Sequence, residues 1–337
     1  MTRTFRPRPS RRVLSALAAA ALTASLASCA LAPSSGDTGS CEKQTSITIA
    51  YQPGLGYANL LLVQVDGTLE EELPGVDITW RELNSGAAIR DGTLAGEIQM
   101  AAGGAGPFII GRGAGMKWKM ISSLNSMNLQ LMTMDPDIRS LEQLEGDGSI
   151  AMPGPDSIQS IVLRKAAQDE LGDPRALDSQ IIAMGHPDGM QALVAGQLEA
   201  HVTAPPFQQQ EAEQGAHALV DSYEVFGGPH TFNGVYAMED FVECNPDISS
   251  AMIDALDAAN EEIAEDPDAA AERLVDVIGG MDAAEISQEL TAEGTEFTTM
   301  PVNMGLFASF MEETGLIREE LTTRDLFFEN DATEGGS

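Results

Sequence analysis

Glycines and small polar residues gather in a few loops that each follow a short apolar run, and their chemistry suits close contact with a small molecule. Glycine lets backbone N–H groups approach a ligand, and helix N-termini add donors and partial positive charge. Such loops can hold an anionic group without arginine. The expected contact residues are Gln52, Tyr57, Ser85, Gly86, Gly104, Gly106, Asp156, Ser157, His186, Asp188, Thr203, Phe207 and His230.

Residue type sets the expected role of each contact. The rings of Tyr57 and Phe207 are expected to form apolar walls, and the hydroxyls of Ser85 and Ser157 to bond a ligand. The remaining polar contacts are expected from the backbone of Gly104 and Gly106 and from the side chains of His186 and Asp188.

Several of these residues also have a purely structural interpretation. Asp156 and Ser157 have the side chains that cap a helix N-terminus, and Asp188 could cap its own helix. His186 precedes a proline and could be a hydrogen-bonded turn residue. The glycines of residues 103–106 lack the spacing of a dinucleotide-binding loop.

The residue pattern gives no support for catalysis, a metal or a cofactor. The four histidines are dispersed, and no Cys/His cluster has metal-ligand spacing. No Ser/His/Asp set or carboxylate pair stands out. We therefore expect a non-enzyme that needs no cofactor. The predicted loops hold few cations but include Asp156 and Asp188, which leaves zwitterions, amines, neutral heterocycles and singly charged sulfonates open as ligands.

Short apolar runs alternate with amphipathic segments, which predicts an α/β architecture with mixed, mostly parallel sheets flanked by helices. Crossings near residues 135 and 230 predict two lobes with a cleft between them, where ligand sites are common. Residues 45–135 and 231–328 would form the first lobe, and residues 136–230 the second. Strands are expected at residues 46–50, 76–83, 97–101, 117–124, 129–134, 149–152, 180–184, 200–203, 218–220 and 232–238.

The N-terminus has the layout of an export signal. Residues 1–28 combine five arginines with an apolar stretch too short to cross a bilayer. The small residues before Cys29 are typical of a lipoprotein signal, so we expect lipidation of Cys29 and a tether over residues 29–44. An ordinary secretory signal is the alternative, and the arginine pair at 11–12 leaves the twin-arginine route open. Residues 329–337 are predicted to form a disordered tail.

Export also bears on the two other cysteines and on the charge. Cys41 and Cys244 would meet an oxidising environment, which favours a disulfide over two free thiols. The formal net charge of −34 becomes −39 once the five arginines of residues 1–28 are removed. So acidic a surface excludes nucleic acid and anionic membrane as partners, and leaves the lipid as the only expected membrane contact.

Three stretches resemble the nitrate/sulfonate/taurine and thiamine-precursor (SsuA-like) family of periplasmic binding proteins. Residues 85–100 resemble the family's serine-glycine turn, helix and strand, with Gln99 where the family has aspartate. Residues 139–146 resemble its "sleDLkGk" segment without the lysine. Residues 185–207 resemble its helix, "aGqvDA" strand and "PF" signature, and are the most specific of the three.

This resemblance implies a two-lobed type II binding-protein fold that delivers a small molecule to an ABC permease and its ATPase. Together with the N-terminal signal and Cys29, it leads us to expect an exported monomer that is lipid-anchored on the outer face of the membrane. A ligand-binding sensor subunit for a membrane kinase is the alternative. A thiamine-precursor enzyme of this fold is a further one, but the cysteine cluster of such enzymes is missing here.

Overall fold

The computed structural model describes residues 41, 43–144, 146 and 148–329. The predicted signal peptide, the lipidation site Cys29, most of the tether and residues 330–337 of the predicted tail lie outside this range. Within the described residues, no helix is both long enough and apolar enough to cross a membrane.

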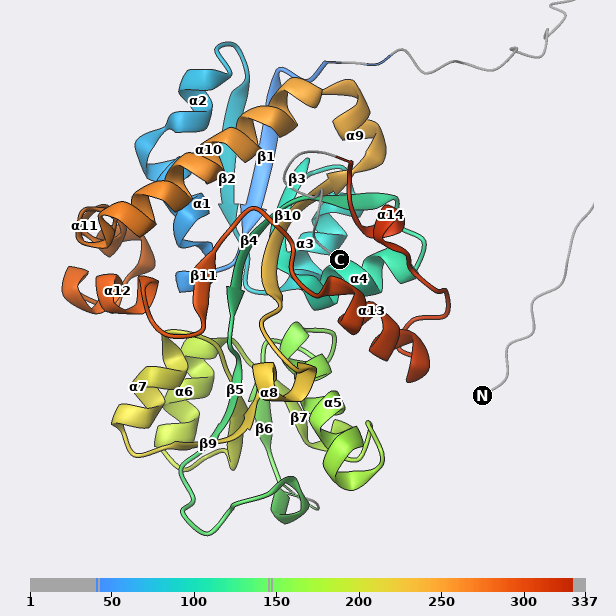
Figure 1. The fold of residues 1–337 in the computed structure, drawn as a ribbon, viewed down its shortest axis with the longest axis vertical. Coiled ribbons are helices and arrows are strands. Elements are labelled where there is room, and N and C mark those ends of the chain that lie inside the picture. Colours follow the sequence, from blue (N-terminus) through green and yellow to red (C-terminus); the bar gives the residue numbers. More distant parts are fainter. Residues whose placement is uncertain (1–40, 42, 145, 147, 330–337) are drawn as a thin grey trace, which may run out of the picture. The chain divides into compact units, whose positions relative to one another are not determined.

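The first lobe is built on a six-stranded sheet with the order β11-β4-β10-β3-β1-β2. Strand β10 returns from the second lobe and inserts antiparallel between β3 and β4, whereas β1 runs parallel to β2 and β3 (Figure 1). The strands are β1 (Ser46–Tyr51), β2 (Asp77–Glu82), β3 (Met100–Gly104), β4 (Trp118–Met127), β10 (Thr231–Met238) and β11 (Thr295–Phe297).

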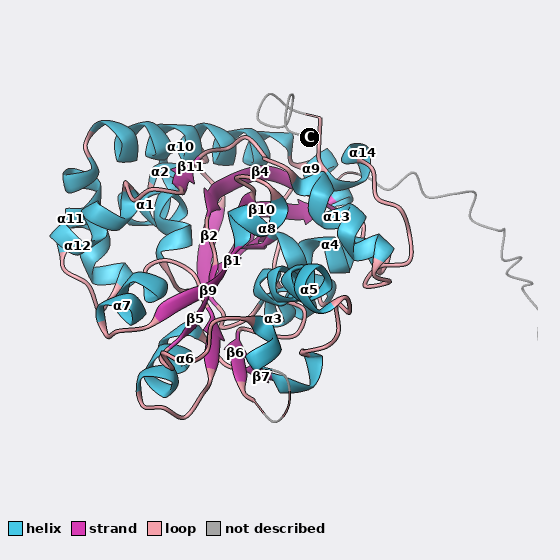
Figure 2. Ribbon diagram, turned by 60° about the horizontal axis from the view of Figure 1, so that its bottom comes forward, coloured by secondary structure: helices cyan, strands magenta, loops and turns pink. Residues whose placement is uncertain are grey.

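Two groups of helices flank this sheet (Figure 2). One group packs beside β1, β2 and β4 and comprises α1 (Ala58–Asp66), α2 (Thr68–Glu72), α10 (Pro246–Glu265), α11 (Pro267–Ile278) and α12 (Ala283–Leu290). The other comprises α3 (Gly86–Leu94), α4 (Ala105–Gly113), α13 (Met304–Glu313) and α14 (Thr323–Leu326). The short helices η1 (Leu55–Tyr57) and α9 (Glu239–Cys244) complete the lobe.

The second lobe is built on a five-stranded sheet with the order β7-β6-β8-β5-β9. Its strands are β5 (Gln130–Thr133), β6 (Ile150–Met152), β7 (Ile181–Ala183), β8 (Ala200–Val202) and β9 (His217–Asp221). Its helices are η2 (Leu141–Leu144), α5 (Ile158–Leu171), η3 (Asp178–Gln180), α6 (His186–Val194), α7 (Phe207–Glu213) and α8 (Ser222–Phe226). The fold is the predicted two-lobed α/β fold with mixed sheets.

Three local expectations need correction. Strand β5 pairs with β8 and β9, so the chain leaves the first lobe at residues 128–129 and not after residue 135. Strand β3 lies three residues later than the predicted strand and runs through Gly103 and Gly104, because its pairing with β10 extends to Gly104. Strand β11 is absent from the expected strands and is added by pairing with the end of β4.

Ser157, Pro107 and Gly196 behave as their residue types predict. Ser157 accepts a hydrogen bond from the N–H of Ser160 at the start of α5, and Pro107 lies in the first turn of α4. Gly196 follows α6 with a φ of 69°, a left-handed conformation that costs glycine little. Local chemistry therefore places the helix starts at the loops from which ligand contacts are expected.

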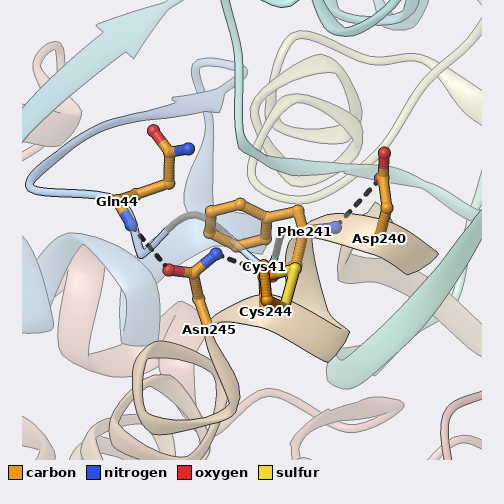
Figure 3. The surroundings of a disulfide bond; sticks show 6 residues. All are labelled: Cys41, Gln44, Asp240, Phe241, Cys244 and Asn245. Atoms are coloured by element: carbon orange, nitrogen blue, oxygen red, sulfur yellow. Dashed lines mark hydrogen bonds between the residues drawn. A yellow bond between two sulfur atoms is a disulfide. The ribbon is translucent and has the colours of Figure 1, made fainter. Parts of the chain in front are cut away.

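A disulfide joins Cys41 to Cys244, with a sequence separation of 203 residues and a Cα–Cα distance of 5.0 Å. Asn245 supports this junction, since its side chain accepts from the Gln44 N–H at 2.8 Å and donates to the Phe241 carbonyl at 2.8 Å (Figure 3). The bond therefore holds the segment that enters β1 against α9.

Replacing both cysteines, as Cys41→Ser with Cys244→Ser, should lower the free energy of unfolding by about 2–5 kcal/mol, because the bond closes a long loop in the unfolded chain. Urea unfolding followed by circular dichroism measures the change. Reduction of the parent protein should reproduce the loss and leave the double variant unaffected. Equal unfolding midpoints for the oxidised parent and the double variant would contradict this prediction.

Candidate functional site

A pocket lies where the helix-starting loops of the two lobes meet. Its cavity volume is about 50 Å³, smaller than the pockets of drug-sized ligands, so the lobes must part for a larger molecule to enter. The first lobe contributes Gln52, Pro53, Tyr57, Ser85, Gly86, Gly104, Pro107, Phe232 and Asn233. The second lobe contributes Pro153, Gly154, Asp156, Ser157, Ile158, Gln159 and His186.

Asn233 organises the first-lobe wall. Its side-chain oxygen accepts from the Tyr57 hydroxyl at 3.2 Å, and its amide donates to the Gly56 carbonyl at 3.2 Å. The Tyr57 hydroxyl also lies 3.4 Å from Gln52 Oε1. Asn233 sits in the middle of the buried strand β10, where an amide is costly unless it is hydrogen-bonded. Sequence reasoning missed this residue, although a polar residue inside an apolar strand was a usable signal.

Ser85 and Gly86 form the turn into α3. The Ser85 hydroxyl caps this helix by accepting from the Ala88 N–H at 3.2 Å. A Cβ atom on Gly86 would lie 2.6 Å from Cγ of Pro107, so only glycine allows this turn to pack against the start of α4. The cap leaves the Ser85 hydroxyl hydrogen free to donate into the pocket.

The second-lobe wall is the turn between β6 and α5. Ser157 caps α5, as its structural interpretation predicted, and its hydroxyl donates to the Gly154 carbonyl at 2.7 Å. Asp156 does not cap the helix. Its carboxylate instead pairs with Arg90 of α3 in the first lobe, at 2.9 Å. Asp156 therefore links the two lobes beside the pocket.

His186 begins α6 and forms the remaining edge of the pocket. Its ring stacks on Phe207, with ring centroids 5.6 Å apart. Its Nε2 lies 3.1 Å from Gln159 Nε2, and its Nδ1 lies 3.1 Å from His201 Nε2. His201 in turn contacts Glu211 at 2.6 Å. Sequence reasoning missed Gln159, His201 and Glu211, which lie on three elements and share no recognisable spacing.

The structure brings eight of the predicted contact residues to this pocket: Gln52, Tyr57, Ser85, Gly86, Gly104, Asp156, Ser157 and His186. A ninth, Asp188, lines an adjoining recess together with Gln52 and His186. Whether each touches ligand stays a prediction.

Four predicted contacts lie away from the pocket lining. Phe207 stands behind His186 and forms no wall. Gly106 packs against the start of α5. The Thr203 hydroxyl is buried and directed toward the Ala204 carbonyl at 3.5 Å. His230 is buried where the chain returns to the first lobe, 2.9 Å from the Ser222 hydroxyl.

The pocket lining is nearly free of charge. Of the sixteen residues that line it, Asp156 is the one with a formally charged side chain, and Arg90 pairs with it. In the part of the chain that the structure describes, no group of three or more His, Cys, Asp or Glu side chains is placed to hold a metal ion. The arrangement can offer hydroxyl, amide, imidazole and backbone groups to a small ligand.

Replacing Arg90 with glutamine should speed ligand release about two- to fivefold, because it removes an ion pair between the lobes. About a quarter of each side chain is exposed, 23% for Arg90 and 27% for Asp156, so a stabilisation of up to about 1 kcal/mol is expected. Stopped-flow dissociation measures the effect, and added salt should diminish it. Arg81→Gln is the matched control, because Arg81 pairs with Glu97 inside the first lobe; equal release rates in the two variants would contradict the prediction.

The two sheets, the two chain crossings and the pocket between the lobes define the periplasmic-binding-protein fold. The model of the NMT1-like family matches residues 40–279. The chain belongs to this family, which confirms the resemblance found in the sequence. A search of curated protein sequences finds no match.

Solved structures show the same fold. The periplasmic aliphatic sulphonate-binding protein SsuA from Escherichia coli is 18% identical with a TM-score of 0.68, over 86% of this chain and 99% of that one. The alkanesulfonate-binding protein SsuA from Xanthomonas axonopodis pv. citri, bound to MOPS, is 16% identical with a TM-score of 0.70, over 85% and 99%. The periplasmic nitrate-binding protein NrtA from Synechocystis PCC 6803 is 15% identical with a TM-score of 0.63, over 80% and 81%.

Proposed function

We propose that this protein is the extracytoplasmic solute-binding component of an ABC importer. It captures a small molecule in the pocket between its lobes and delivers it to a membrane permease. The observation that carries this proposal is a pocket lined by both lobes, because a ligand held from both sides favours their closure. Sulfonates, nitrate, taurine-like zwitterions and pyrimidine precursors of thiamine are the candidate solutes.

A thermal-shift screen of the purified protein tests capture. Sulfonates, nitrate, amines, pyrimidines and flavins are compared at equal concentration. A solute present at 100 times its Kd should stabilise the folded state by about 2.7 kcal/mol, which raises Tm by several degrees. Asn233→Leu should abolish the shift, because it removes the amide that bonds Tyr57 and Gly56. A panel that leaves Tm unchanged, or turnover of a solute by the protein alone, would contradict the proposal.

We further propose that the protein is exported, processed before Cys29 and held at the outer face of the membrane by a lipid on that residue. Cys29→Ser should release the protein from the membrane fraction, and mass spectrometry should lose the acyl mass on the N-terminal peptide. We expect a monomer, and light scattering measures this. Membrane retention of Cys29→Ser would overturn the anchor without affecting the proposed capture of a solute.

A further inference from the structure

A line of hydrogen-bonded side chains runs from the pocket into the second lobe. It begins at Gln159 on α5, passes through His186 on α6 and His201 on β8, and ends at Glu211 on α7. Its three contacts measure 3.1, 3.1 and 2.6 Å. The first two members line the pocket, whereas His201 and Glu211 are fully buried. A buried carboxyl group is therefore connected to the ligand site through two imidazoles.

Glu211 is poorly placed to stay ionised. Its Oε1 contacts His201, but its Oε2 is buried and has no hydrogen-bond partner. An ionised carboxylate with an unpaired buried oxygen is strongly destabilised. Burial raises the pKa of Glu211 to about 8 and lowers the pKa of His201 to about 3. At neutral pH the proton between these two groups therefore belongs to Glu211.

The position of this proton sets the direction of every hydrogen bond in the line. Protonated Glu211 donates to Nδ1 of His201, which then carries its hydrogen on Nε2 and donates to Nδ1 of His186. His186 must in turn carry its hydrogen on Nε2, the atom on the pocket side, and the Gln159 amide must then turn its oxygen to that atom in place of the nitrogen that lies 3.1 Å away in the structure. Ionised Glu211 reverses each bond, so that Nε2 of His186 becomes an acceptor. Rotation of the Gln159 amide accommodates either direction.

We propose that Glu211, His201 and His186 form a proton relay through which the pocket becomes cationic when it binds a small molecule carrying one oxyanion group. This inference rests on the proposed solute-binding function. On binding, the Glu211 proton passes to Nδ1 of His201 while the proton on Nε2 of His201 passes to Nδ1 of His186. The relay keeps its net charge of zero, and its positive end comes to lie against the ligand. Such a device supplies the cation that the pocket lining lacks.

The residues packed around His186 and His201 favour proton transfer between them. A Cβ atom on Gly189 of α6 would lie 2.7 Å from Nε2 of His201, so the glycine gives the ring access to His186. Phe207 stacks on His186 and fixes its plane. Burial and the neighbouring His201 lower the pKa of His186 well below its usual value, so this ring takes up a second proton and becomes imidazolium only when an anion stabilises it.

The titratable groups on the surrounding elements engage other partners or lie outside hydrogen-bond contact with the line. Asp156, before α5, pairs with Arg90, and Arg164 of α5 pairs with Asp178. Tyr57 across the pocket donates to Asn233. Asp188 on α6, Glu199 before β8, Glu213 on α7 and Glu289 on α12 make no hydrogen bond to the line among the described residues.

The relay is testable without a ligand, by the nitrogen resonances of the histidine rings. The chain has four histidines, so 15N-histidine labelling gives a simple spectrum, with His217 and His230 as internal references. His186 and His201 should both carry hydrogen on Nε2 at pH 6.5 and change together to Nδ1 as pH rises through about 8. Glu211→Gln should abolish this change, because its amide donates at every pH. Unchanged tautomers in the parent from pH 6 to 9.5 would overturn the relay.

Ethanesulfonate and its neutral analogue ethanesulfonamide then test the oxyanion. Adding ethanesulfonate at pH 7 should convert His186 to imidazolium. The affinity of the protein for ethanesulfonate should fall about tenfold per pH unit above pH 8, because binding then requires the uptake of a proton. In Glu211→Gln the affinity should be lower and independent of pH. Ethanesulfonamide should show neither effect.

Failure of the relay and failure of the proposed function give different results. A concerted tautomer change with no response to ethanesulfonate or nitrate would overturn the oxyanion assignment. Binding of ethanesulfonate without a tautomer change would overturn the relay and leave solute capture standing. If Glu211→Gln does not fold, the titration of the parent decides the matter alone.

Discussion

Replacing Gly106 with leucine should weaken solute capture about 100-fold while the protein stays folded. A Cβ atom on Gly106 of α4 would lie 2.8 Å from the backbone nitrogen of Ile158 and 2.9 Å from its Cα. These backbone atoms belong to the start of α5 in the second lobe and cannot rotate away. A larger side chain must therefore separate the two lobes at the pocket. Overpacking of this kind costs about 1–3 kcal/mol. Here it destabilises the closed form, in which the two lobes meet at the pocket, and therefore weakens ligand binding.

The Gly106 series separates closure from folding. Gly106→Ala should also lower affinity, because its Cβ alone meets the backbone of Ile158, but less than the leucine variant, whose side chain is larger. Calorimetry with the solute found in the screen gives the affinity, and small-angle scattering should show a larger radius of gyration. Gly305→Leu is the matched control, since Gly305 is also the second residue of a helix and its Cβ would meet nothing within 4 Å. Unchanged affinity and scattering in Gly106→Leu would contradict the prediction.

Replacing Trp118 with alanine should lower the free energy of unfolding by about 3–5 kcal/mol, the range for a large buried aromatic residue. Trp118 is fully buried in the first lobe, with ring centroids 5.9 Å from Phe108 and 4.8 Å from Tyr236. Its indole N–H donates to the Phe108 carbonyl at 3.1 Å. Gly111 lies directly against the ring, so no neighbouring side chain there can fill the cavity.

Urea unfolding followed by circular dichroism measures this loss. Trp80→Phe is the control, because Trp80 is partly exposed and donates to Glu70 at the surface; we expect it to cost less than about 1 kcal/mol. If the free energy of unfolding falls by a similar amount in the two variants, the prediction is wrong, and the cluster of Trp118, Phe108 and Tyr236 is not a major source of first-lobe stability.

Sequence reasoning predicted which loops form the pocket better than it predicted which of their residues line it. Helix N-caps and glycine turns are decided within a few residues, so the turns that hold Gln52, Ser85 and Ser157 were expected at the pocket where the structure has them. Gly106 shows the limit of this approach. It lies two residues from the pocket residue Gly104, yet its close neighbour is Ile158, more than fifty residues away.

The sequence by itself determined the α/β class, the two-lobed plan, the family and most of the loops that form the pocket. These properties follow from local periodicity, caps and ordered motifs. Only the tertiary structure decided that β5 belongs to the second sheet, that Phe207 supports His186 from behind, and that Glu211 reaches the pocket through His201. The physical reason is that strand pairing, ring stacking and buried hydrogen bonds join residues far apart in the chain, where no sequence spacing specifies the partner.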